Sequence, residues 1–238
     1  MSLISKEMPA AVPGCVHLDL ITAGVIRHPN KGSSELEQGW VGRTDFSWSN
    51  TIKSDLLAEH VGEDRVVEIV FDSIDTVAEI RLGGELLGSA CNQFHPHRFQ
   101  IQAGGGELEV SIAAPLDQLD ELVARHGGRP VNADGAWGIY SYLRKSACAF
   151  GWDWGPMCPG SGLLGPVRIE SYERARIESV RPLTVRCDER LAIVDVHVDV
   201  VRICDGDLGM RAKIISPSGR IFKAEVVGNG NTFVARLE

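Results

Sequence analysis

Apolar and polar residues alternate along much of this chain. Leu108, Val110 and Ile112 are separated by polar residues, and the same period of two runs through 76–82 and, most clearly, through 194–200. Successive side chains of a strand point to opposite faces, so this period predicts half-buried strands. We therefore expect β-sheets with one face against a core.

Other segments complete the predicted strands. Residues 66–71 are almost entirely apolar, which is typical of an interior strand, and 167–170 read as a further strand. Gly83-Gly84 between two apolar runs predicts a tight hairpin, and 216–219 predicts a hairpin with a longer loop.

Helical patterns are few. Residues 115–126 carry leucines at helical spacing, begin with a proline and are followed by two glycines, which predicts one helix. A short helical turn is expected at 55–60. Many strands with few helices favour an all-β fold made of β-sandwiches.

The pattern predicts two domains. We place the first at 1–174 and the second at 175–238, because a strand ends near 170 and a new set of strands begins near 176. The second is shorter than the about 100 residues of an immunoglobulin-like sandwich. We therefore expect that sandwich to be partial and the chain to be a truncated piece of a longer protein.

Composition narrows the functional classes. Hydrophobic residues make up 44% of the chain, enough for a substantial core, and the net charge of −8 argues against nucleic acid as a partner. No apolar run is long enough to span a membrane, and the first residues lack a signal-peptide pattern, so we expect a cytoplasmic protein. The six cysteines show no C-x-x-C spacing, which argues against a zinc site.

The segment Gly151-Trp152-Asp153-Trp154-Gly155-Pro156 carries the most chemical information. In an extended segment Trp152 and Trp154 would share one face and Asp153 would take the other. An indole can lie against the C–H face of a sugar, and a carboxylate can accept hydrogen bonds from two hydroxyls. A tryptophan-rich corner that fills the sandwich core is the alternative interpretation.

Other candidates are weaker. His95 and His97 have the spacing of two metal ligands on one strand face, but no carboxylate or cysteine cluster accompanies them, so we expect no metal. The glycines at 104–106 lack a nucleotide-binding pattern, and we expect no cofactor. Trp40 and Trp48 are assigned to the sandwich core or an interface.

The segment from Ser141 to Pro156, SYLRKSACAFGWDWGP, resembles the signature of the β-mannosidases of glycoside hydrolase family 2. The stretches 12–20, 71–80 and 92–99 are similar to other segments of that family in order and spacing. The resemblance covers about residues 8–172 and implies a galactose-binding-like jelly-roll sandwich followed by part of an immunoglobulin-like one.

The resemblance also implies that catalysis takes place in a different domain of the enzyme. In such enzymes two glutamates of a (β/α)₈ barrel perform retaining hydrolysis, and the acid/base glutamate usually follows an asparagine. No asparagine of this chain precedes a glutamate, and no barrel-length pattern of strands and helices is present. The chain is thus expected to hold no catalytic residue and to be inactive alone.

Roles for the tryptophan segment follow from the same resemblance. Trp152 and Asp153 are the expected contacts to a terminal mannose, or to an oligosaccharide that carries it, and Trp154 would pack in the sandwich. Arg144 and Lys145 would orient Asp153, or else be ordinary surface charges.

Three alternatives remain open. A free-standing carbohydrate-binding module would complete its last domain, whereas a structural interaction domain would bury Trp152 and Asp153. A related β-galactosidase or β-glucuronidase would share most of the segments outside the tryptophan motif. Whether the reading frame continues for several hundred codons would separate a fragment from a module.

Overall fold

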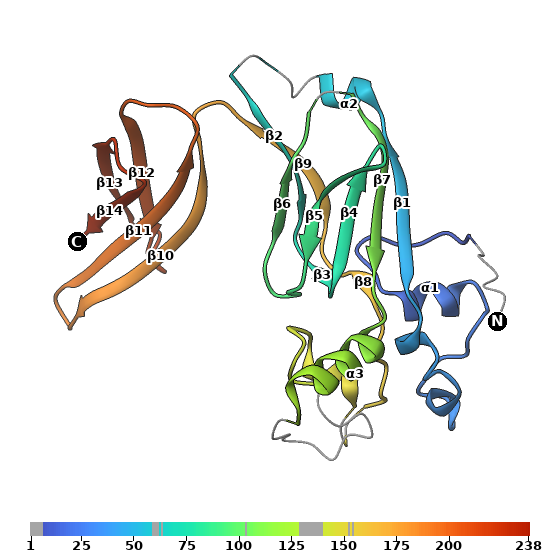
Figure 1. Cartoon of the computed structure of the whole chain (residues 1–238). Helices are drawn as coiled ribbons and strands as arrows, with labels where there is room; N and C mark the ends of the chain where they lie inside the picture. The colour runs from blue at the N-terminus through green and yellow to red at the C-terminus, as the bar shows by residue number, and fades with distance from the viewer. Residues whose placement is uncertain are drawn as a thin grey trace. The chain divides into compact units, whose positions relative to one another are not determined.

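The computed structural model describes residues 7–58, 62, 64–102, 104–128, 140–151, 153 and 155–238. They divide into two compact units, the first formed by Met1–Val61 with Val67–Glu170 and the second by Gly62–Val66 with Ser171–Glu238 (Figure 1). The division predicted at 174/175 stays a prediction from the sequence.

Strands dominate both units, and the all-β prediction is confirmed. The strands up to residue 172 are β1 (Phe46–Ile52), β2 (Val66–Phe71), β3 (Ile74–Asp75), β4 (Ala78–Leu82), β5 (Glu85–Ala90), β6 (His97–Gln100), β7 (Gly106–Ile112), β8 (Gly162–Leu163) and β9 (Val167–Tyr172). The helical segments between them are α1 (Val16–Thr22), η1 (Ser34–Glu37), η2 (Val41–Arg43), α2 (Ser54–Ala58), α3 (Pro115–His126) and η3 (Ala147–Phe150).

The first unit is built on two sheets and a short strand pair. One sheet has the order β1-β7-β4-β5 and the other β6-β2-β9, while β3 pairs with β8. β7 lies antiparallel to both β1 and β4, with Val110 opposite Trp48 on one side and Ile80 on the other.

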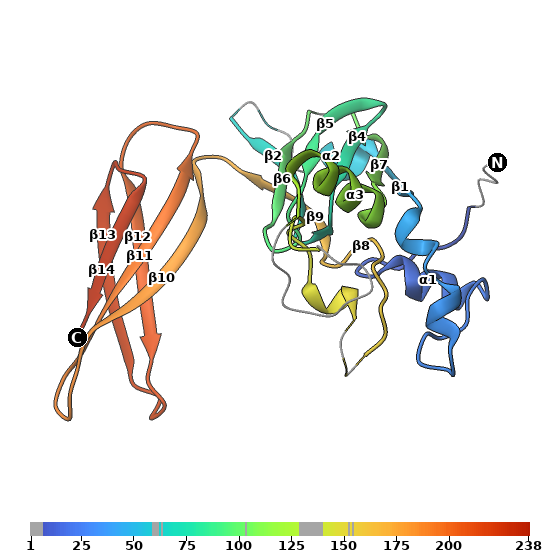
Figure 2. The same ribbon diagram turned by 60° about the horizontal axis from the view of Figure 1, so that its bottom comes forward.

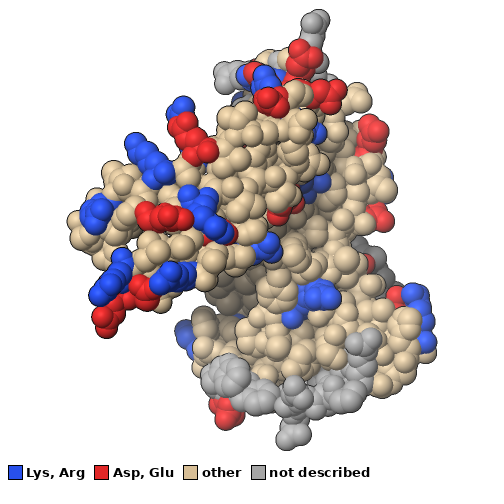
Figure 3. All heavy atoms as spheres, turned by 90° about the vertical axis from the view of Figure 1, so that its left-hand side faces the viewer, with Lys and Arg blue, Asp and Glu red and all other residues tan. Residues whose placement is uncertain are grey.

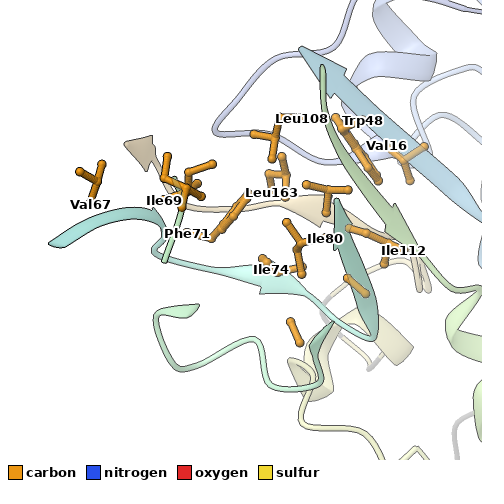
Figure 4. Packing of buried hydrophobic residues seen from close by; sticks show 14 of the residues in the cluster. Val16, Trp48, Val67, Ile69, Phe71, Ile74, Ile80, Leu108, Ile112 and Leu163 are labelled. Carbon is orange, nitrogen blue, oxygen red and sulfur yellow. The ribbon is translucent and has the colours of Figure 1, made fainter. Parts of the chain in front are cut away.

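One hydrophobic core joins these strands. Ile80 and Ile112 of the first sheet and Ile69 and Phe71 of β2 are buried, and Figure 4 shows their side chains in one layer between the ribbons. Trp48 also lies in this core, as expected. Trp40 is 43% exposed, so it does not lie in the core, and its alternative assignment to an interface stays a prediction.

Several local predictions are confirmed. Gly83 and Gly84 have φ angles of 57° and 84° and connect β4 to β5, because glycine adopts positive φ values without steric cost. The predicted helix 115–126 is α3, which starts at Pro115 and ends before Gly127, where φ is 78°. Helix α1 was not expected.

The second unit is a small sandwich of its own. Its strands are β10 (Ala175–Cys187), β11 (Ala192–Arg202), β12 (Leu208–Ile215), β13 (Ile221–Gly228) and β14 (Thr232–Leu237). The sheet β10-β11-β14 packs its buried Val196, Val198 and Phe233 with the hairpin β12-β13 (Figure 2). The alternating valines of 194–200 lie in β11, as predicted.

Basic and acidic side chains are interspersed on the face that Figure 3 shows. Among the helices that the described residues form, none is long and apolar enough to cross a bilayer.

Candidate functional site

Asp153 lies in a turn and its side chain is exposed. Its carboxylate is therefore accessible to a ligand. A purely structural interaction domain was expected to bury Asp153, so the exposure of this residue disagrees with that alternative. Trp152 and Trp154, the other two residues of the predicted site, lie outside the described residues. Their shared face stays a prediction.

The chain before Asp153 packs against helix α3. Leu143 and Phe150 join the buried Leu116 and Leu119 of α3 in a separate hydrophobic cluster. The rings of Tyr140 and Phe150 stack with centroids 4.9 Å apart. Figure 1 shows this part of the chain (yellow) beside α3, below the strands of the first unit.

Lys145 is the most deeply embedded charge near the site. It is only 6% exposed, and its ammonium forms an ion pair with Asp75 at the end of β3, which is 7% exposed. The same Nζ donates to the carbonyl of Gly160 at 2.6 Å. The idea that Lys145 is a surface charge was therefore wrong, because the fold buries its side chain beside the carboxylate of Asp75.

Lys145 also differs from the prediction in its partner. No described hydrogen bond joins its ammonium to Asp153, and the two acceptors are Asp75 and Gly160. Asp75 in turn accepts the hydroxyl of Thr76 on its other oxygen. Among the described contacts, Lys145 is linked to Asp153 through the backbone that carries both residues.

Arg144 has an exposed side chain, and its backbone makes the described contacts. Its carbonyl accepts from the N–H of Gln93 at 3.0 Å, beside a parallel bridge to Asn92. The side-chain oxygen Oε1 of Gln93 in turn accepts a hydrogen bond from the N–H of Ser146 at 2.7 Å. These bonds hold the start of the segment to the chain between β5 and β6.

Further bonds hold the chain that follows Asp153. The N–H of Met157 donates to the carboxylate of Glu35 at 3.1 Å, and the N–H of Cys158 donates to the carbonyl of Ala149 at 3.0 Å. Gly151 has a φ of 84°, a value that favours glycine, and opens the turn that contains Asp153. The bond between Cys158 and Ala149 therefore brings the two ends of the stretch that contains Asp153 close together.

Burial shifts the pKa values of His17, Lys145 and Cys158. Burial, aided by the nearby charge of Lys145, lowers the pKa of His17 to about 4. Burial also lowers the pKa of Lys145, against the opposing effect of Asp75. The pKa of Cys158 rises to about 11, through burial first and then the charge of Glu35.

The site offers the exposed carboxylate of Asp153 for hydrogen bonding. Among the described residues, no group of three or more His, Cys, Asp or Glu side chains is arranged to hold a metal ion. His95 is exposed, and Nε2 of His97 is hydrogen-bonded to the carbonyl of Asn92 at 2.8 Å.

Sequence reasoning missed Asp75, Glu35 and His17 as neighbours of the segment. Each is far away in the chain: Asp75 lies 70 positions from Lys145, and Glu35 lies 122 positions from Met157. No local pattern marked Asp75 as a buried partner, because Ile74 is a single apolar residue after Ser73 and a second aspartate, Asp72, lies three positions earlier.

Known proteins resemble this chain in sequence and in structure. Residues 2–165 match the sequence profile of the family described as "Glycosyl hydrolase 2 galactose-binding domain-like". Beta-mannosidase B of Thermothelomyces thermophilus is 34% identical over 205 residues, which are 83% of this chain and 23% of that protein. The beta-mannosidase of Capra hircus is 33% identical over 178 residues, or 71% of this chain and 20% of that protein.

A solved structure agrees over almost the whole chain. The crystal structure of a β-D-mannosidase from Dictyoglomus thermophilum superposes with a TM-score of 0.79 at 27% identity and covers 98% of this chain and 29% of that one. This chain thus spans about a fifth of the length of the curated relatives that it matches. The resemblance found in the sequence is confirmed.

Proposed function

Because this chain belongs to the glycosyl hydrolase 2 galactose-binding domain-like family, we propose that it is the N-terminal, non-catalytic part of a β-mannosidase-like glycoside hydrolase. Its partners are then a β-mannoside, or an oligosaccharide ending in one, and a catalytic barrel contributed by the rest of the enzyme. The names of the relatives support this assignment, since several are β-mannosidases.

The observation that carries the proposal is the exposed carboxylate of Asp153 on an anchored segment. A carboxylate in this position can accept hydrogen bonds from two neighbouring sugar hydroxyls, each contributing roughly 1.5–3 kcal/mol. Trp152 is the proposed second contact, through its indole face, and Trp154 is proposed to support them from the sandwich. Together they form one wall of the terminal-mannose subsite.

The chemistry itself lies elsewhere in this proposal. A retaining glycosidase uses two carboxyl groups about 5–5.5 Å apart, one as nucleophile and one as acid/base. The contribution of this chain is to hold the terminal sugar in register with that pair. Binding that orients a substrate lowers the barrier by removing its translational and rotational freedom beforehand.

Binding by the chain alone is expected to be weak and to depend on Asp153. One wall of a pocket buries little ligand surface, so the Kd for methyl β-D-mannoside is expected to be on the order of millimolar or weaker. Saturation-transfer difference NMR detects such binding. The Asp153→Asn variant keeps the shape of the side chain and is expected to weaken binding at least tenfold.

Asp205→Asn is the matched control, because Asp205 is also an exposed aspartate but lies in the second unit. A signal that is equal in wild type and Asp153→Asn would contradict the subsite assignment. Micromolar binding by the isolated chain would favour the alternative, a free-standing carbohydrate-binding module.

Hydrolysis by the isolated chain is expected to be absent. With p-nitrophenyl β-D-mannoside as substrate, release of nitrophenol should stay at the rate of the buffer blank, because neither glutamate of the retaining pair is identified in this chain. Release of nitrophenol that co-purifies with the protein through a final column would refute the non-catalytic assignment. The protein must then come from a host strain that lacks its own β-mannosidase activity, so that a contaminating enzyme does not explain the signal.

A further inference from the structure

A single ammonium group closes the segment that carries Asp153. Lys145 stands at its start and Gly160 at its end, fifteen positions later, and the Nζ–O distance between them is 2.6 Å. Loops of 6–16 residues whose ends lie close together form compact surface units. Here the closure is made by a side chain, in addition to backbone bonds.

The closure is fastened to the sandwich from below. The ion pair between Lys145 and Asp75 joins the segment to β3, and Asp75 also pairs through its backbone with Gly162 on β8. Gly160 faces α1: a Cβ added there would lie 2.4 Å from Nδ1 of His17. The end of the segment is therefore packed as tightly as its start.

The environment of the pair explains why it can fix a position. Both charged residues are almost fully removed from solvent: Lys145 is 6% exposed and Asp75 is 7% exposed. Water cannot replace a lost hydrogen-bond partner at a buried charge. Separating Lys145 from Asp75 or Gly160 therefore leaves buried polar groups without a partner. A surface ion pair would lack this property, because water replaces either partner at little cost.

We propose that Lys145 is a positioning residue: its buried bonds to Asp75 and Gly160 hold the two ends of the segment 145–160 together, and this closure presents Asp153 to a sugar. The relevance to sugar binding rests on the proposed function, whereas the anchoring of the segment does not. Lys145 itself touches no substrate in this scheme.

The test compares two variants of the full 238-residue chain. Lys145→Met removes the ammonium and leaves Asp75 as an unpaired buried charge, so this variant is at risk of unfolding. Lys145→Met combined with Asp75→Asn removes both charges and keeps an acceptor for Thr76. The control is Arg81→Met combined with Glu79→Gln, which removes an exposed ion pair, with side chains 40% and 60% exposed, from β4 of the same unit.

Methionine methyl signals report the segment and the two cores separately. The chain has four methionines. Met157 lies on the segment and its backbone is bonded to Glu35, whereas Met8 packs on the core of the first unit and Met210 on that of the second. Labelling with ¹³C-methyl methionine, with assignment by Met→Leu substitution, gives a separate reporter for each.

In the double variant of Lys145 and Asp75, the Met157 resonance is expected to move to its position in the urea-unfolded chain. Met8 and Met210 should keep their native positions, and the control pair should change none of them. An unchanged Met157 resonance in a folded double variant would overturn the proposal. Loss of the Met8 signal as well would also overturn it, because the pair would then serve the whole sandwich and not the segment.

Titration with methyl β-D-mannoside separates this inference from the proposed function. The double variant is expected to bind at least tenfold more weakly than wild type, although Asp153 is intact. If wild type shows no binding while Met157 responds as predicted, the subsite proposal fails and the anchoring stands. If wild type binds and the double variant binds equally well, the role of Lys145 in presenting Asp153 fails.

Discussion

Lys145→Met is expected to lower the free energy of unfolding of the first unit by about 3–5 kcal/mol, the range for breaking a buried ion pair from one side. The cause is the carboxylate of Asp75, which stays buried beside an apolar side chain and loses its counter-charge. The carbonyl of Gly160 loses its donor at the same time. Urea unfolding followed at the Met8 signal measures this change for the first unit alone.

The double variant with Asp75→Asn is expected to recover most of that loss. Removing both members of a buried pair avoids the desolvated lone charge, and such replacements are often close to neutral. The two single substitutions should therefore be strongly non-additive in a double-mutant cycle. Costs that simply add would show that the two residues do not depend on each other.

The free energy of unfolding of the first unit is also expected to fall by about 3 kcal/mol as the pH drops from about 6.5 to 4, through His17 alone. Burial lowers the pKa of His17 to about 4 in the folded chain, below the 6.5 of the unfolded one. Between these values the unfolded state binds the proton first. The stability from neutral His17 is therefore complete above pH 6.5 and is lost as the pH falls to 4.

Urea unfolding at a series of pH values measures this slope. His17→Gln, which cannot titrate, should lack the part of the slope that comes from His17, so this part appears as the difference between wild type and variant. His95→Gln should keep the wild-type slope, because His95 is exposed. An acid slope that is the same in all three proteins would contradict the assignment of His17 as a buried neutral imidazole.

Local patterns predicted many elements because their causes are local. The alternation of Leu108, Val110 and Ile112 matches β7, whose residues at these positions are buried. Pro115 and Gly127 mark the two ends of α3 because each restricts or frees the φ angle at its own position. Helix α1 was missed because it is seven residues long and its Val16 and Leu20 also suit an extended segment.

For the candidate site, the sequence identified the residues of the motif but not the contact that anchors it. Asp153 and its flanking tryptophans stand out in the sequence because their side-chain chemistry suits a sugar, whatever the fold. Lys145 stands in the same motif, but its partner could not be deduced, since many carboxylates of the chain were equally eligible. Only the pairing of β3 with β8 brings Asp75 beside Gly160 and the ammonium.

The sequence by itself determined the all-β class, the strands with a period of two, and the segment that carries Asp153 between two indoles. Tertiary structure alone decided that Lys145 is buried, that it pairs with Asp75 seventy positions away, and that Glu35 bonds the backbone of Met157. The physical reason is that periodicity reports which face of an element leaves water. The partner of a buried charge depends instead on which distant strands the topology places side by side.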